Sequence, residues 1–271
     1  MLNLWESEKK IKDRQAFLQE LKPVIIMSRG HSGTRVISFA CSHLGLRLGT
    51  TEGLATGDAD NQTFTQKIKK LAVTNYLRVD PVNVVERDLI FFQKAVMRYH
   101  EELGSPGELW GWKFPETYLI SPYVARTFPH ARYLHLVRDG RDIAFKNHLT
   151  DDPTRKLGKK LLSSINALEE PHHIQAGMSW AYQVDNFDQF REFIKPQQVM
   201  DMRFEDLCMY PHETISNLCE FLQLPMTDSC KTYLDTKIDT SKVAQYKESD
   251  PALVREVESR IKDTLSRYRY L

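Results

Sequence analysis

Residues 22–37 read KPVIIMSRGHSGTRVI, and the rest of the chain is best interpreted outward from them. The apolar run at residues 24–27, with three β-branched side chains, predicts a buried strand. A loop with two glycines follows. Beyond it, apolar residues return at helical spacing, at Ile37, Cys41 and Leu44. The stretch therefore predicts a strand, a loop and a helix that begins near Thr34.

This loop has the features of a phosphate-binding site. Gly30 and Gly33 allow the backbone to approach an anion closely, and the first N–H groups of the helix supply unpaired donors with about half a positive charge. Five side chains add donors to the same rim: Arg29, His31, Ser32, Thr34 and Arg35. A magnesium–triphosphate site requires G-x-x-x-x-G-K-[ST], and neither glycine is followed by that Lys-hydroxyl pair. The loop predicts a phosphate-containing donor bound without a metal ion.

Composition limits the kinds of partner. The chain has 271 residues, with 37 Lys and Arg against 36 Asp and Glu, so no overall field attracts nucleic acid or an anionic membrane. It has no apolar core of signal-peptide length at its start and no run of about eighteen apolar residues, which predicts a cytoplasmic protein without a transmembrane segment. The four cysteines form no C-x-x-C pair and have no nearby His at zinc-ligand spacing, which predicts no metal site.

Strand-like and helix-like patterns alternate along the chain. Apolar runs that predict strands occur at residues 24–27, 46–48, 110–115, 132–137 and 199–204. The alternation predicts an α/β fold, with a central, mostly parallel sheet flanked by helices, in a single domain over residues 1–271. Residues 1–21 hold an amphipathic N-terminal helix. Residues 150–175 are polar and weakly periodic, and we expect a mobile, lid-like segment there.

Three motifs together resemble a known family. Residues 29–35, RGHSGTR, resemble the 5′-phosphosulfate loop of sulfotransferases. Residues 133–145, YLHLVRDGRDIAF, are similar to the 3′-phosphate-binding strand and helix of that family. Residues 202–225, MRFEDLCMYPHETISNLCEFLQLP, are similar to its R-[YF]-E-D-L, Pro, F-L-x-L pattern. The motifs span residues 22–224 in the family's order, and the resemblance implies the P-loop-like sulfotransferase fold.

The resemblance also implies a donor, 3′-phosphoadenosine 5′-phosphosulfate (PAPS), which has two separate phosphate groups. The family's binding site for the 5′-phosphate corresponds to Ser32, Gly33, Thr34 and Arg35, and its binding site for the 3′-phosphate corresponds to Arg138. Lys146 stands where the family usually has a serine, and a lysine still holds phosphate as a point charge. Lys242 resembles a late lysine that returns to the donor phosphates. A donor with two phosphates needs two anion sites, and the chain offers two basic turns.

Catalytic roles follow from the same comparison. His31 stands where the family commonly has the Lys or Arg that contacts the bridging oxygen, and Arg29 is an equal candidate for stabilising the leaving phosphate. Lys113, in the sequence GWKFP, matches a second cation near the transferred group. The family's glutamate base corresponds to Glu52. Three other residues are further base candidates: Asp58, Asp60 and His100.

We therefore expect an enzyme that transfers a sulfuryl group from PAPS to a hydroxyl or amine, on a carbohydrate or a small hydroxylated metabolite. PAPS, its product adenosine 3′,5′-bisphosphate (PAP) and the acceptor are the expected partners. Two alternatives are a P-loop kinase of small molecules and a non-catalytic module that binds adenosine bisphosphate. The motifs select neither an acceptor class nor an oligomeric state, since acceptor pockets are built by variable loops.

Overall fold

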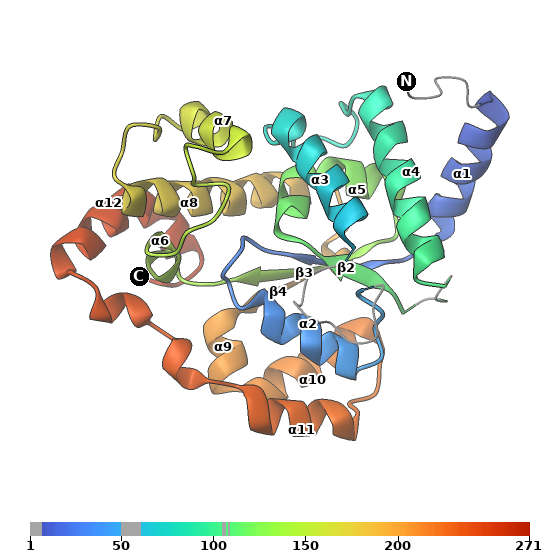
Figure 1. Cartoon of the computed structure of the whole chain (residues 1–271). Helices are drawn as coiled ribbons and strands as arrows, with labels where there is room; N and C mark the ends of the chain where they lie inside the picture. The colour runs from blue at the N-terminus through green and yellow to red at the C-terminus, as the bar shows by residue number, and fades with distance from the viewer. Residues whose placement is uncertain (1–6, 50–60, 105–106, 108) are drawn as a thin grey trace.

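A computed structural model describes residues 7–49, 61–104, 107 and 109–271. Its centre is a parallel sheet of four strands in the order β2-β1-β3-β4 (Figure 1). The strands are β1 (Val24–Met27), β2 (Gly111–Lys113), β3 (Arg132–Val137) and β4 (Val199–Arg203). In the register of the sheet, Ile26 of β1 lies between Lys113 and Leu134. The carboxyl ends of all four strands therefore meet at one edge, where ligands of α/β proteins bind.

Strand β1 is buried on both faces, as its unbroken apolar sequence requires. Ile25 and Met27 face one core, and Val24 and Ile26 face the other, because successive side chains of a strand point to opposite sides. The first core holds the large aromatic residues, with Trp112 at its centre. The loop after β1 thus begins from a rigid and fully enclosed strand.

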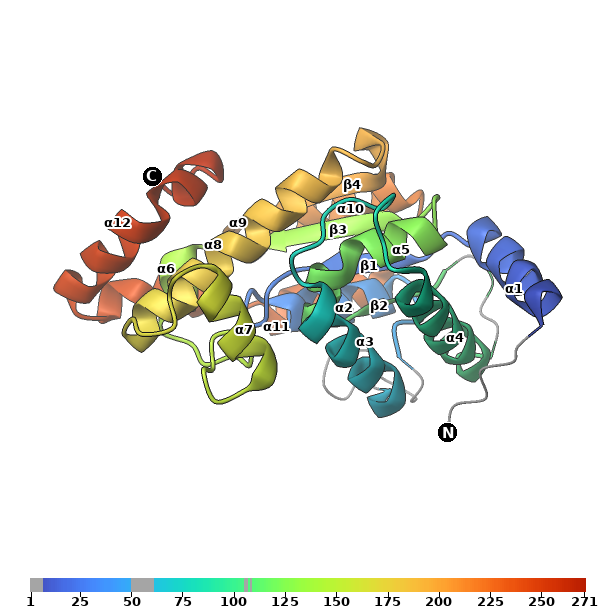
Figure 2. The same cartoon turned by 90° about the horizontal axis from the view of Figure 1, so that it is seen from above.

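Helices cover both faces of the sheet. Figures 1 and 2 show α3, α4, α5, α7 and α8 on one face, with α2, α9, α10 and α11 on the other. The twelve helices of the described residues are α1 (Glu8–Glu20), α2 (Thr34–His43), α3 (Gln62–Asn75), α4 (Glu86–Glu102), α5 (Ser121–Thr127), α6 (Gly140–Ala144), α7 (Lys156–Ser164), α8 (His172–Arg191), α9 (Phe204–Met209), α10 (Pro211–Leu222), α11 (Asp228–Lys237) and α12 (Pro251–Arg267). The same residues also form four short 3₁₀ helices: η1 (Pro115–Ile120), η2 (Pro196–Gln198), η3 (Thr240–Lys242) and η4 (Gln245–Glu248). Across the parts that can be described, no helix is both long and apolar enough to cross a membrane.

The predicted fold class is confirmed, since the sheet is wholly parallel and flanked by helices. The strand predicted at residues 46–48 is reduced to a single bridge between Arg47 and Trp110. Within the segment predicted as a lid, residues 156–164 form α7, whose Leu157, Leu161 and Leu162 are buried. Its local signal is weak because it has only three apolar residues, and Gly158 lies between Leu157 and Leu161. The mobility of residues 150–175 stays a prediction.

Candidate active site

The loop of residues 28–33 joins the carboxyl end of β1 to the start of α2. Gly33 takes the left-handed conformation, with φ at +83°, and α2 begins at Thr34 as predicted. In the described part of the chain, no side chain caps this helix. The first turn of α2 therefore presents its N–H groups and the positive end of the helix dipole at the sheet edge where ligands bind.

Both glycines of the loop are needed because aromatic rings occupy the space beside them. A Cβ atom on Gly33 would lie 2.1 Å from Cδ2 of Phe204, and one on Gly30 would lie 2.4 Å from Cδ2 of His148. Phe204 begins α9 after β4, whereas His148 follows α6. Two distant segments thus hold the loop from its sides.

Arg29 lies beneath the loop. Its side chain is 1% exposed, and Nη2 lies 2.5 Å from Oδ1 of Asp151, while Nη1 donates to the main-chain oxygen of Gly30 at 2.9 Å. Burial lowers the pKa of Arg29, and the Asp151 carboxylate opposes that shift. In this arrangement the guanidinium is engaged with the loop and its counter-ion. Its predicted contact with a leaving phosphate stays a prediction.

His31 lies on the exposed side of the same loop. Its φ is +70°, an uncommon value for a residue with a side chain. Two contacts hold that conformation: Nε2 donates to the main-chain oxygen of Asn147 at 2.8 Å, and the oxygen of His31 accepts from Nη1 of Arg138 at 3.2 Å. Burial lowers the pKa of His31, and the positive charge of Arg29 lowers it further. The ring is therefore mainly neutral at pH 7 in the absence of a ligand.

Arg138 follows β3 and lies beside this loop. Besides its bond to the oxygen of His31, it binds Oδ2 of Asp142 at 2.8 and 3.1 Å and donates to the oxygen of Lys242 at 2.5 Å. Its guanidinium stacks 4.5 Å from the centre of the Phe204 ring. The structure therefore brings the two predicted anion sites into direct contact.

Two further predicted lysines lie around that second turn. Nζ of Lys146 is 3.3 Å from Oε1 of Gln245, at a cavity of about 280 Å³ that Tyr246 also lines. Lys242 places its main-chain oxygen on Arg138, while its ammonium is exposed and 3.5 Å from Asp239. The segment before α12 thus packs on the second turn.

The remaining candidates are scattered around the loop or lie elsewhere. Lys113 is buried at the end of β2, Ser32 and Thr34 are buried, and Arg35 is exposed in the first turn of α2. His100 packs edge-on against Trp110 at the end of α4, in the aromatic core, where burial lowers its pKa. Three predicted acids lie outside the described residues: Glu52, Asp58 and Asp60.

The structure adds residues that the motifs did not indicate. His148, Thr150 and Asp151 line up beside the loop and are joined by hydrogen bonds. Asp151 is separated from Arg29 by 122 positions in the sequence, so no local pattern indicates the pair. Phe204 belongs to a quoted motif, yet its contacts with Gly33 and Arg138 appear only in the fold.

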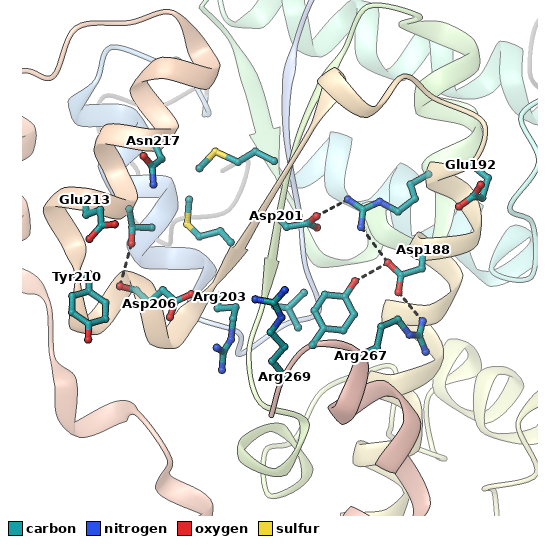
Figure 3. A pocket seen from close by; sticks show the side chains of 16 residues that line it. Asp188, Glu192, Asp201, Arg203, Asp206, Tyr210, Glu213, Asn217, Arg267 and Arg269 are labelled. Carbon is teal, nitrogen blue, oxygen red and sulfur yellow. Dashed lines mark hydrogen bonds and ion pairs between the residues drawn. The ribbon is translucent and has the colours of Figure 1, made fainter. Parts of the chain in front are cut away.

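A cavity of about 720 Å³ lies away from this loop, along the outer edge of β4 (Figure 3). Arg191 bridges Asp201 at 2.7 Å and Asp188 at 3.5 Å, and Arg267 binds Asp188 at 2.8 Å. Oδ1 of Asp201 also bonds to Nδ1 of the buried His135 at 2.8 Å. These charges neutralise one another, whereas no side chain of the described residues caps the start of α2. The loop is the better candidate for an anionic ligand.

Comparisons with known proteins bear on the family and the fold of the chain. A sequence model of the sulfotransferase family matches residues 23–228. The sulfotransferase domain from the curacin biosynthetic pathway is similar in structure, with 15% identity, a TM-score of 0.55 and coverage of 90% of this chain and 98% of that one. The sulfotransferase domain of the Synechococcus PCC 7002 olefin synthase has 14% identity, a TM-score of 0.53 and coverage of 91% and 96%. A sulfotransferase from Mycobacterium avium has 16% identity, a TM-score of 0.50 and coverage of 94% and 80%. No curated protein sequence matches the chain significantly.

Proposed function

The chain belongs to the sulfotransferase family, and from this premise we propose that it transfers a sulfuryl group from PAPS to a hydroxyl or amine of a carbohydrate or small hydroxylated acceptor. One observation carries the proposal. Arg138, at the end of β3, bonds to the main chain of His31 in the loop after β1, beside the uncapped start of α2. Two anion sites in contact suit a donor with two phosphate groups.

The residues present fit such a donor. The first turn of α2, with Ser32, Thr34 and Arg35, would hold the 5′-phosphosulfate, and Arg138 with Lys146 would hold the 3′-phosphate. Each charge-assisted hydrogen bond to a phosphate contributes about 1.5–3 kcal/mol. Bond formation at both turns therefore accounts for useful donor affinity and for discrimination against nucleotides that have phosphate at one end only.

Catalysis requires positive charge where the leaving phosphate gains negative charge. The acceptor oxygen forms a bond to sulfur, the bond from sulfur to the phosphate oxygen breaks, and the leaving adenosine bisphosphate keeps the electron pair. His31 is on the exposed side of the loop and is our first candidate for a contact with that oxygen. Arg29, engaged with Asp151 beneath the loop, is the second candidate. Lys113, at the end of β2, supplies a further cation.

Donor identity is tested by thermal stabilisation. We expect PAP at a hundredfold excess over its Kd to raise Tm by about 5–10 °C, and ADP with magnesium to have a much smaller effect. An Arg138→Lys variant keeps a charge for Asp142 but loses the two-nitrogen contact geometry, and should bind PAP about 10- to 100-fold more weakly. Arg255→Lys, at an exposed position in α12, is the matched control.

Each alternative function has its own result in this experiment. Stabilisation by ADP with magnesium alone would support the kinase and contradict the sulfotransferase proposal. Binding of PAP without turnover of labelled PAPS, in the presence of a panel of glycans, phenols and primary alcohols, would support the non-catalytic module.

The pH dependence of PAP binding tests His31. The free protein holds the pKa of His31 below its usual value, and bound phosphates raise it because they favour the protonated ring. Binding therefore takes up a proton, and affinity should rise as the pH falls from 8 toward 5.5, by up to tenfold per unit between the two pKa values. Phosphate groups also titrate in this range, so the same titration with His31→Asn provides the baseline. Equal slopes in the two proteins would remove His31 from the donor site.

A further inference from the structure

A hydrogen-bonded chain runs from His148 to the ion pair beneath the loop. Nδ1 of His148 lies 2.9 Å from Oγ1 of Thr150, and Oγ1 lies 3.1 Å from Oδ1 of Asp151. The same carboxylate oxygen is 2.5 Å from Nη2 of Arg29. Thr150, Asp151 and Arg29 are each at most 1% exposed. Water therefore does not compete for these partners.

This chain determines which nitrogen of His148 carries the proton. A carboxylate in an ion pair only accepts hydrogen bonds, so the Thr150 hydroxyl gives its single proton to Asp151. The Thr150 oxygen then acts as an acceptor, from the amide of Gln183 at 3.3 Å and from Nδ1–H of His148. The main-chain N–H of Thr150 also points at Nδ1, but its 3.4 Å contact is the weakest of the set. In the tautomer that makes the shorter of these two Nδ1 contacts, Nε2 is the unprotonated nitrogen.

Nε2 lies on the ring edge that faces the phosphate loop. A Cβ on Gly30 would be 2.5 Å from it, and the ring of His31 lies edge-on with centroids 6.0 Å apart. His148 also lines a cavity of about 370 Å³ with Asp151 and Leu149, and its side chain is partly exposed. Nε2 is thus next to the loop, and the His148 side chain also borders a cavity.

The surroundings keep this imidazole neutral. Burial lowers the pKa of His148 well below its ordinary value, and the positive charges of Arg29, Lys69 and Lys113 lower it further, as does His31 when it is protonated. Three other titratable groups line the same cavity: Asp152, Arg155 and His172. A bound donor adds negative charge beside the ring, which favours proton uptake by His148 in the complex.

We propose that His148 is the general base of the transfer reaction, and that Thr150 and Asp151 hold it in the tautomer that accepts the proton. The inference rests on the function proposed above. The acceptor O–H gives its proton to Nε2 as its oxygen bonds to sulfur, and the sulfur–oxygen bond to the donor phosphate breaks with its electron pair on the phosphate. The imidazolium then interacts with the Asp151 carboxylate through Thr150, and it returns its proton to water after product release. Glu52 is the competing candidate.

Substitutions of similar shape distinguish the roles of Nδ1 and Nε2 of His148. His148→Asn keeps a donor near the Nδ1 position but lacks Nε2, and should lower kcat for PAPS turnover by about 10²- to 10⁴-fold, with PAP affinity within about threefold of wild type by this mechanism. Thr150→Ala should lose part of kcat, and Thr150→Ser should restore it, because serine keeps the hydroxyl. His130→Asn, an exposed histidine outside the site, is the matched control, and Glu52→Gln tests the competitor.

Histidine ¹⁵N NMR of the free protein gives a readout that needs neither donor nor acceptor. We expect Nε2 of His148 to have the shift of a bare ring nitrogen and Nδ1 that of an N–H, with the preference weakened in Thr150→Ala. If Thr150 and His148 had purely structural roles, the position of the ring proton and kcat would not change together in these variants.

The outcomes separate this inference from the function on which it rests. A wild-type protein that turns over PAPS, with His148→Asn retaining kcat within threefold, would overturn the base assignment and leave the sulfotransferase proposal standing. Two other results would also overturn only the base assignment. One is an NMR spectrum with the proton on Nε2 of His148, and the other is a loss of turnover in Glu52→Gln but not in His148→Asn. Absence of PAP binding by the wild type would overturn both.

Discussion

An Asp151→Asn substitution is expected to lower the free energy of unfolding by about 3–5 kcal/mol, because it leaves the guanidinium of Arg29 buried without a counter-charge. Both side chains of this pair are fully enclosed, and the contact is 2.5 Å. The loss is measured by urea denaturation with a common m value. Asp152→Asn, at the next position, is the matched control. Asp152 is partly exposed and bonds locally to Thr154, so that change should leave the free energy of unfolding close to that of the wild type.

A double substitution distinguishes a buried charge from a general packing loss. Arg29→Met with Asp151→Leu removes both charges, and apolar replacements of a buried pair are often neutral or stabilising. We expect the double variant to recover much of the stability lost in Asp151→Asn, while losing the positioning of His148. A single Asp151→Asn variant within 1 kcal/mol of wild type would show that the pair carries little net energy.

A Gly33→Ala substitution has the second large effect. The methyl group would lie 2.1 Å from the Phe204 ring, and the residue would have to keep φ near +83°. The left-handed conformation alone costs about 1–2 kcal/mol, and overpacking adds about 1–3 kcal/mol. Since Phe204 also stacks on Arg138, its displacement should weaken PAP binding at least about tenfold.

Gly45 provides the control for backbone strain. Its φ is +95°, and a Cβ there would meet nothing within 4 Å, so Gly45→Ala carries the conformational cost without the collision. We expect Gly33→Ala to be the more destabilised of the two and the only one with impaired PAP binding. Equal losses would mean that the contact between Gly33 and Phe204 has no energetic role.

The strands were predictable because their signals are local. Residues 24–27 are apolar without interruption and residues 132–137 are mostly apolar, as a sheet buried on both faces requires. Residues 46–48, with Arg47 between two leucines, form only one bridge, since a strand also needs a partner of matching length. Helix α7 gives a weak local signal because it is short, has only three apolar residues and contains Gly158.

The candidate site was predictable only in part, for a similar reason. The loop at 29–35 and the turn at Arg138 are each a short continuous stretch of sequence, so each has a local signal. The structure places the two together. The roles of Thr150 and Asp151 depend on a partner more than a hundred positions away, so a polar stretch was the only local signal. Residue types alone did not reveal that Arg29 would be enclosed and His31 exposed.

The position of β1 inside the sheet also affects how the chain folds during synthesis. The partners of β1 begin at residues 111 and 132, and the counter-ion of Arg29 comes later still, at residue 151. At a synthesis rate of about 5–20 residues per second, the apolar run at 24–27 waits on the order of ten seconds for its neighbours. During that interval it is an unpaired, aggregation-prone segment, and its contacts of long sequence separation favour slow folding. Chaperone dependence should therefore be greatest for nascent chains that have not yet reached β3.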